Sequence, residues 1–351
     1  MKVAVITCYK QPDYVRAQTL RAAVAANGHT LFTVKNSRKG LLRYLEVFLK
    51  TLALRIRHRP DTYIITFRGY EILPFIGVIT WPKRLIFDEF ISPLGWLYEP
   101  RPEVWAKYVP KKALGWLYRI LLRRPAVILA DTQATAAYSS ALTYGGGGSH
   151  NYVALPVSTD ETLFTPVKKT AVKKTFSVFY YGNMLPLHGI QYVLDAAVML
   201  QNLPIEFVIV GGKNMEAGVG AAVGQGARIR YHAWIDYNNL PEEIHAASLC
   251  LGGPFGATKQ AELVITGKTY QFLACQAPVL IGKNKATSLF KHQKNCLMVP
   301  LGDSAALAKQ ISWAYSHQDK LQEIAANGRQ LYEKHFSISA ISPQLEAVLG
   351  V

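Results

Sequence analysis

Two glycine-bearing turns stand where this chain could hold a phosphate group. Gly182 and Gly189 lie in a turn that joins the apolar strand beginning at Phe176 to a helix. A second strand, 205–210, ends in Gly211-Gly212-Lys213, one βαβ length further along. Free backbone N–H groups and a helix N-terminus bind anions, so the spacing indicates a nucleotide site. It matches neither the GxGxxG fingerprint nor a Walker loop, and any α/β domain has glycines at such turns.

Alternating strands and helices must position these turns. Strand-like segments bounded by turn residues occur at 2–7, 30–34, 63–67, 84–87 and 127–130, and again from Phe176, Ile205, Ile229, Ser248 and Val279. The alternation predicts an α/β protein with two doubly wound, Rossmann-like domains. Pro166 and the run KKTAVKK interrupt the pattern, so we expect the linker near 160–175. The predicted domains are 1–163 and 164–336.

The charge of the chain is positive and uneven. The 351 residues carry a formal charge of +16, and residues 1–165 hold 22 Lys and Arg against 11 Asp and Glu. Such an excess predicts an anionic partner surface, either nucleic acid or acidic lipid. We find no RNP-like aromatic strand, zinc finger or recognition-helix pattern, so we expect no nucleic-acid partner. A nucleic-acid binder, resting on charge alone, is the weakest of the alternatives.

Two basic segments favour lipid. Eight Lys or Arg accompany a nearly continuous apolar surface in 35–60, and Trp116 and Tyr118 lie among basic residues in 108–125. Aromatic, aliphatic and basic residues on one helix are typical of an interfacial anchor. We therefore expect an anionic membrane surface as a partner. Ordinary packed helices with solvated Lys and Arg would explain the same pattern.

The remaining composition bounds the location and the chemistry. The N-terminus enters a strand directly and no apolar run is long enough to span a bilayer, so we expect a cytoplasmic protein, peripheral on the inner face of the cell membrane. The sequence offers no CxxC pair, and neither His232 nor His245 has a second ligand at helical spacing, so we expect no metal site. Free thiols, most of them buried, are expected at Cys8, Cys250, Cys275 and Cys296.

From residue 153 onward, an ordered series of motifs runs VALPVSTDETLFTP, FYYGNMLPLHGIQYVLDAA, IEFVIVGG, IRYHAWIDYNNLPEEIHAASLCLG, GKTYQFLACQAPVLIG and NCLMVPLGDSAALAKQI. This series resembles the retaining, nucleotide-sugar-dependent glycosyltransferases of family 4. The N-terminal half matches less well, through MKVAVIT, NGH and LIFDEFIS. The resemblance implies the GT-B architecture: two Rossmann-like domains facing each other across a cleft, with a C-terminal helix at 337–351 crossing back to the first domain.

The resemblance also implies a reaction and its residues. A sugar would pass from a nucleoside diphosphate sugar with retention at the anomeric carbon, as in a hexosyltransferase, and without a catalytic metal or other cofactor. Negative charge on the departing diphosphate would then be stabilised by helix N-termini, backbone N–H groups and side-chain donors. Lys268 is the leading diphosphate contact. The other donor-binding candidates are Gly182, Asn183, His188, Gly211, Gly212, Gly253, Phe255, Thr269 and Gln271.

Three of these positions depart from the family pattern. Asn183 and His188 stand where an Arg and a Lys are usual, which reduces positive charge at the diphosphate. Gln271 stands where a Glu commonly binds the ribose hydroxyls, and an amide loses the charge-assisted hydrogen bond. These departures leave a second hypothesis open, a non-catalytic GT-B subunit that binds a partner enzyme, a glycan or a nucleotide.

The acceptor side offers two adjacent carboxylates as further catalytic candidates. By the resemblance, Asp88 and Glu89 lie where the family often places a His or an acidic group beside the sugar. Adjacent strand residues face opposite sides, so at most one of them can point into the cleft. Arg16 could meet a phosphate or the acceptor, although an ordinary helix position explains it as well. The first hypothesis is thus a membrane-associated glycosyltransferase that extends a lipid-linked or cell-envelope glycan.

Overall fold

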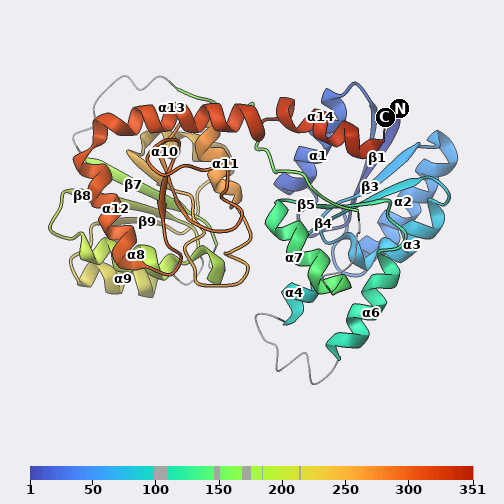
Figure 1. Ribbon diagram of the computed structural model, residues 1–351, viewed down its shortest axis with the longest axis horizontal. Helices are drawn as coiled ribbons and strands as arrows, with labels where there is room; N and C mark the ends of the chain where they lie inside the picture. Colours follow the sequence, from blue (N-terminus) through green and yellow to red (C-terminus); the bar gives the residue numbers. More distant parts are fainter. Residues whose placement is uncertain (99–109, 146–150, 168–174, 184, 213–214, 351) are drawn as a thin grey trace. The chain divides into compact units, whose positions relative to one another are not determined.

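The computed structural model describes residues 1–98, 110–145, 151–167, 175–183, 185–212 and 215–350 (Figure 1). The chain forms two units, each built on one six-stranded parallel sheet: Met1–Ser158 with Ile338–Val351, and Thr159–Ser337. The first boundary thus lies five residues before the predicted 163/164, and the second lies one residue after 336/337. Lys213 and the linker segment 168–174 lie outside the described residues.

The sheet of unit 1 has the strand order β2-β1-β3-β4-β5-β6. Its strands are β1 (Lys2–Thr7), β2 (Thr30–Lys35), β3 (Thr62–Ile65), β4 (Arg84–Phe90), β5 (Val127–Ala130) and β6 (Tyr152–Ala154). The inner strands are rich in Val, Ile, Leu and Phe and almost wholly buried, as expected for a parallel sheet covered on both faces. The chain reverses direction of winding between β1 and β3, so their carboxyl ends form the switch point of this sheet.

Alternate strand residues divide the core of unit 1 between two helical layers. Val3 and Val5 of β1 pack with α1 (Val15–Ala26) and α14 (Ile338–Leu349). Ala4 and Ile6 pack with α2 (Leu42–His58), α3 (Leu73–Ile79) and α6 (Lys111–Leu121). The period of two therefore places one helical layer on each face. The remaining described elements of unit 1 are η1 (Gly69–Glu71), α4 (Pro93–Tyr98) and α7 (Gln133–Tyr144).

Helix α14 returns to the N-terminal unit, as the sequence predicts for the end of the chain. Asn27 donates to the Ser342 carbonyl at 2.8 Å, and His29 pairs with Glu346 at 2.8 Å. Ile341 and Leu345 complete the core that α1 forms with the sheet. The last helix therefore belongs to the fold of unit 1 (Figure 1).

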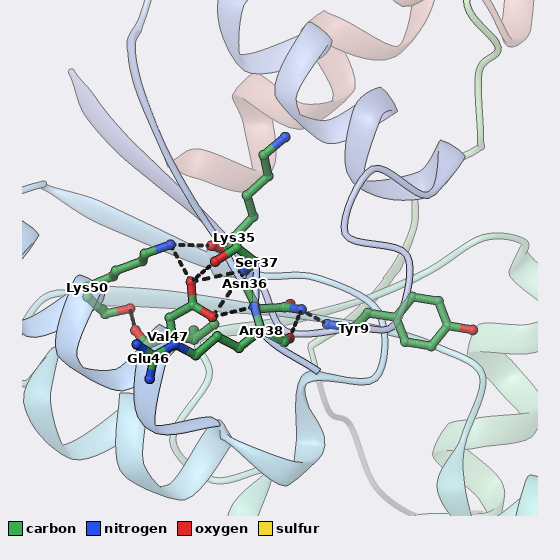
Figure 2. Close-up of polar contacts among 9 residues, drawn as sticks. Tyr9, Lys35, Asn36, Ser37, Arg38, Glu46, Val47 and Lys50 are labelled. Carbon is green, nitrogen blue, oxygen red and sulfur yellow. Dashed lines mark hydrogen bonds and ion pairs between the residues drawn. The ribbon is translucent and has the colours of Figure 1, made fainter. Parts of the chain in front are cut away.

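A carboxylate on α2 fixes the loops that follow β1 and β2 (Figure 2). Glu46 accepts hydrogen bonds from the backbone N–H groups of Ser37 and Arg38 and pairs with Lys50 at 2.6 Å. The pKa of Glu46 is lowered, chiefly by the hydrogen bond from Lys50 and then by these backbone donors. The Asn36 side chain in turn accepts from the N–H of Tyr9 at 3.0 Å. The start of the loop that carries Tyr9 away from β1 is thereby held in place.

Unit 2 has the strand order β12-β11-β10-β7-β8-β9, with all strands parallel. Its switch point lies between β7 (Phe176–Tyr181) and β10 (Leu249–Leu251). The other strands are β8 (Ile205–Val210), β9 (Ile229–His232), β11 (Val279–Gly282) and β12 (Leu297–Val299). The helical elements are η2 (Pro186–His188), α8 (Ile190–Met199), α9 (Glu216–Gly224), η3 (Tyr237–Asn239), α10 (Leu240–Ala246), α11 (Gly267–Ala274), α12 (Ser304–Ser316) and α13 (Gln318–His335).

The four cysteines, the predicted strands and the basic helices can be compared directly with the structure. All four thiols are free and buried. The strand-like segments given in the sequence analysis include neither β6 nor β12, each a strand of three residues. Of the basic segments, 42–58 and 111–121 form helices, whereas residue 35 ends a strand.

Candidate functional site

A buried lysine lies at the switch point of unit 2. Lys268 is the second residue of α11, and its ammonium donates to the carbonyl of Tyr181 at the end of β7, at 3.0 Å. The same Nζ lies 3.8 Å from the centroid of the Tyr180 ring. Burial lowers the pKa of Lys268 to about 7. Among the described residues no carboxylate forms an ion pair with it, so the site can accept an anion.

Glycines at the ends of β7 and β8 let the backbone approach this ammonium. A Cβ at Gly182 would lie 3.4 Å from Lys268 Nζ. Gly211, with φ +97°, lies so close to the neighbouring strand that a Cβ there would lie 2.5 Å from the Gly182 carbonyl oxygen. The predicted pair of glycine-bearing strand ends is therefore brought together, with Lys268 beside it. Gly212 follows directly, and its carbonyl accepts the hydroxyl of Tyr231 at 2.9 Å.

The turn after β7 carries Asn183 and His188, two of the three positions that depart from the pattern the sequence resembles. His188 ends η2, and burial together with the nearby Lys268 lowers its pKa to about 3. Its Nδ1 atom is buried and has no hydrogen-bond partner among the described residues. Asn183 is exposed. The structure therefore places a neutral imidazole and an accessible amide near the lysine.

The loop after β10 meets this turn through its backbone. A Cβ at Gly189, where φ is +63°, would lie 2.4 Å from the backbone nitrogen of Gly256, so no larger residue fits between the two segments. Gly253 precedes this contact, and the Phe255 side chain is buried in the core of unit 2. The Thr269 hydroxyl is also buried, 3.1 Å from that of Thr266. The Thr266 hydroxyl donates to the Gly252 carbonyl, so the start of α11 is bound to the loop after β10.

Gln271 is held between two tyrosines. Its Oε1 accepts a hydrogen bond from the hydroxyl of Tyr181, and its Nε2 donates to the hydroxyl of Tyr237 at 3.0 Å. Gln271 lies one helical turn after Lys268, so both side chains leave the same face of α11. The Tyr237 ring packs edge-on against Phe164, with centroids 5.5 Å apart. Sequence reasoning missed both tyrosines, although Tyr181 ends a predicted strand and Tyr237 stands shortly beyond the end of another.

The two acidic candidates of unit 1 lie on opposite sides of β4, and both are fully buried. Asp88 accepts two hydrogen bonds from Arg16, at 3.0 and 2.9 Å. Burial raises the pKa of Asp88, and Arg16 opposes that shift. Glu89 accepts from the Tyr118 hydroxyl at 2.8 Å, and burial raises its pKa to about 7. Arg16 also donates to the carbonyls of Leu155 and Pro156, so it serves the packing of unit 1.

Other groups gather at the switch point of unit 1, where the sequence analysis had placed none. The rings of Tyr9, Tyr14, Phe67 and Phe90 form a cluster, and Tyr9 and Phe67 lie 5.2 Å apart. Asp131 follows β5, and burial raises the pKa of its carboxyl to about 6. An available signal was that each of these residues stands just beyond or at the end of a strand, apart from Tyr14.

The described residues contain neither a metal-binding cluster nor a membrane-spanning helix. No group of three or more His, Cys, Asp or Glu side chains in that part of the chain is arranged to hold a metal ion. No described helix has the length and the apolar character that a bilayer crossing requires.

Residues 175–317 match the family model described as "Glycosyl transferases group 1". The chain is similar in structure to HepE of Anabaena in complex with UDP, with 16% identity, a TM-score of 0.71 and full coverage of both chains. The chain has the GT-B fold. It is also similar to sucrose-phosphate synthase of Thermosynechococcus elongatus, with 16% identity, 99% and 98% of the two chains covered and a TM-score of 0.72. A glycosyltransferase of Rickettsia africae is similar as well, with 12% identity, 99% and 97% of the two chains covered and a TM-score of 0.70.

No curated protein matches the sequence. The family match and the fold together support a glycosyltransferase of the GT-B class. The predicted fold class is confirmed. The matched segment contains Lys268, Gln271 and the glycine-bearing turns, so the candidate site lies inside it.

Proposed function

We propose that this protein is a metal-independent, retaining glycosyltransferase that binds a nucleoside diphosphate sugar in unit 2. The observation that carries the proposal is Lys268, a cation buried at the switch point with no carboxylate beside it among the described residues. A buried charge without a counterion is costly, and a diphosphate would supply that counterion. A bound diphosphate would also raise the pKa of Lys268 and keep the ammonium protonated.

Each neighbour of the lysine has a role in this proposal. The backbone of Gly182 and the turn that ends at Gly189 would face the phosphates, while Lys268 would stabilise the charge that grows on the departing diphosphate. Gln271, one turn along α11, would face the ribose. His188 is neutral near pH 7 because its pKa is low, so it would hydrogen-bond to the donor rather than add charge.

The acceptor is proposed to be a lipid-linked or cell-envelope glycan that meets unit 1. The Tyr9, Tyr14, Phe67 and Phe90 cluster at the switch point of that sheet is the kind of aromatic surface that lines ligand sites. The basic helices α2 and α6 would bring the protein to the inner face of the cell membrane. HepE is described in complexes with UDP and UDP-glucose, which makes UDP-sugars the first donors to test.

A donor screen tests the proposal. UDP-, GDP-, ADP- and dTDP-sugars are incubated with the protein and anionic vesicles, and released nucleoside diphosphate is measured. We expect release from one donor by wild type and by Lys309→Met, which changes an exposed lysine on α12. Lys268→Met should abolish it. The anomeric configuration of the product, read by NMR, tests retention, and the same assay with excess chelator tests metal independence.

If no donor sugar gives nucleoside diphosphate release, the result would favour the non-catalytic subunit. Tight binding of a nucleoside diphosphate by calorimetry, without release, would leave the donor site intact and assign the protein a binding role. The absence of both release and binding would overturn the nucleotide-sugar proposal.

A further inference from the structure

Helices α3 and α6 expose a row of large apolar side chains that the proposed chemistry does not use. Val78, Trp81 and Trp116 are 76%, 66% and 61% exposed. Phe75 on α3 and Ile120 on α6 are exposed as well. We call these five residues the α3–α6 face. Large apolar side chains gathered on a protein surface mark interaction sites, and the sequence analysis had assigned no role to α3.

A groove of about 390 Å³ runs between these two helices, and its lining is mainly apolar. Its walls include Leu73, Gly77, Val78, Trp81, Ile120 and Arg124. Glycine at position 77 leaves room for Arg124, because a Cβ there would lie 3.0 Å from the Arg124 Cγ. The groove therefore offers apolar walls and one guanidinium.

Two arginines converge on the end of α3 without an acidic partner among the described residues. Arg124 donates to the carbonyls of Gly77 and Lys83 at 3.0 and 2.9 Å, and its guanidinium lies 5.2 Å from the Trp81 ring centroid. Arg55, near the end of α2, donates to the Trp81 carbonyl at 2.5 Å. Burial and then Arg55 lower the pKa of Arg124, as expected where two cations approach each other.

The sequence around the face carries one sign of charge. The described residues 72–83 and 112–130 contain no Asp or Glu, and they contribute Lys83, Lys112, Arg119, Arg123 and Arg124. Of these, Lys83 lies 3.8 Å from the carboxylate of Asp61. A second copy packed face to face would bring these cations together, so charge disfavours a homodimer here. An occupant with apolar chains and anionic head groups would satisfy both the apolar row and the cations.

We propose that the α3–α6 face inserts into an anionic bilayer, with the groove taking the acyl chain of a lipid whose phosphate meets Arg55 and Arg124. The inference rests on the proposed membrane function and narrows it to a surface centred on α3 and α6 rather than on α2. Val78, Trp81 and Trp116 would enter the interface, while the flanking lysines and arginines would remain among the head groups.

Co-sedimentation of the 351-residue chain with vesicles tests this assignment. Vesicles of phosphatidylglycerol with phosphatidylcholine are compared with pure phosphatidylcholine. We expect the double variant Val78→Glu, Trp116→Glu to lower partitioning onto anionic vesicles at least about tenfold, because it removes apolar insertion and adds repulsion. Val223→Glu, Trp234→Glu changes the same residue types on unit 2, where both are exposed, and should keep binding within about twofold.

A third variant separates the two basic helices. Leu45→Glu, Leu49→Glu places the same charges on the exposed apolar side of α2 and should bind more tightly than the α3–α6 variant. Lipids with spin labels along the acyl chain should quench tryptophan emission of wild type, and Trp81→Phe should remove part of that quenching. The inference is overturned if the α3–α6 variant binds as wild type, if the α2 variant alone loses binding, or if wild type ignores anionic vesicles.

Two further readouts keep this inference apart from the transferase proposal. Nucleoside diphosphate binding without vesicles should be equal in wild type and in the two double variants of unit 1, because Lys268 is in unit 2. Loss of vesicle binding with intact nucleotide binding supports the membrane face whatever the donor is. Size-exclusion chromatography tests the competing occupant, since a dimer of wild type that the α3–α6 variant dissociates would identify a second copy of the chain and refute the lipid assignment.

Discussion

Among the described residues, each unit buries one lysine or arginine side chain, and the two have different partners. Arg16 in unit 1 makes two hydrogen bonds to Asp88 and two to peptide carbonyls. Lys268 in unit 2 has one peptide carbonyl and the face of a tyrosine ring. A cation whose donors are satisfied by its own fold has no need of a ligand. A cation left short of partners at a strand switch point is where a ligand is expected.

The comparison separates a structural ion pair from a candidate site. Both residues were considered for phosphate contact from the sequence alone, because the residue type is the same kind of signal in each case. Only the partners distinguish them. Asp88 and Asp131 each keep one buried oxygen without a hydrogen-bond partner among the described residues, but only Asp88 has an ion pair there, with Arg16. Asp131 therefore becomes the carboxyl of unit 1 to test for a ligand.

Lys268→Met tests most directly whether the buried cation of unit 2 serves a ligand. We expect it to weaken binding of the nucleoside diphosphate by roughly 100-fold, since a charge-assisted contact contributes about 3 kcal/mol. The midpoint of unfolding should stay the same or rise, because methionine removes the cost of burying the ammonium. Calorimetric titration and urea unfolding measure the two effects, with Lys309→Met as the control. A variant that loses stability along with binding would show that Lys268 is structural.

Asp88→Asn tests the other side of the comparison. It leaves the Arg16 guanidinium buried without its counterion, so we expect unit 1 to lose about 3 to 5 kcal/mol of stability. Nucleotide binding by unit 2 should be unchanged. Denaturant unfolding and calorimetry report the two quantities. If Asp88→Asn instead unfolded like wild type but abolished sugar transfer, Asp88 would be the catalytic group and the ion pair would be secondary.

Glu89 adds a pH test within unit 1. Its pKa in the folded protein is about 7, raised from 4.5 by burial, so the folded state holds the proton more tightly than the unfolded state does. Stability attributable to Glu89 therefore falls as pH rises from about 4.5 to 7 and is constant above that, a change of about 3 kcal/mol.

Glu89→Gln keeps an acceptor for Tyr118 and removes the titration. We expect the variant to match wild type near pH 4.5 and to be more stable at pH 8, as measured by denaturant unfolding at both values. Exposed Glu323→Gln serves as the control. A difference that does not depend on pH would mean that Glu89 is ionised in the folded protein.

Features that depend on residue type and local order could be predicted from the sequence, whereas features that depend on distant partners could not. Strand periodicity placed five strands in each half, and the motif order implied the GT-B fold, because both signals are local. The sequence did not predict the tyrosines beside Gln271, because a hydrogen bond between residues 181 and 271 depends on the fold. It missed α3 as a surface because the apolar run LPFIGVI reads equally well as core.

Gln271→Glu tests the same distinction within α11, where Lys268 has too few partners and Gln271 has two. The hydroxyls of Tyr181 and Tyr237 can both donate to a carboxylate, which has about four lone-pair sites and so keeps room for a ribose hydroxyl. We expect an intact fold and UDP affinity raised by up to about tenfold, since a charge-assisted hydrogen bond is about twice as strong as a neutral one. Titration with 2′,3′-dideoxyuridine diphosphate, which lacks the ribose hydroxyls, should show no gain. An equal gain for both nucleotides would place the ribose away from Gln271, and the two tyrosines would then serve only to hold α11 against β7 and η3.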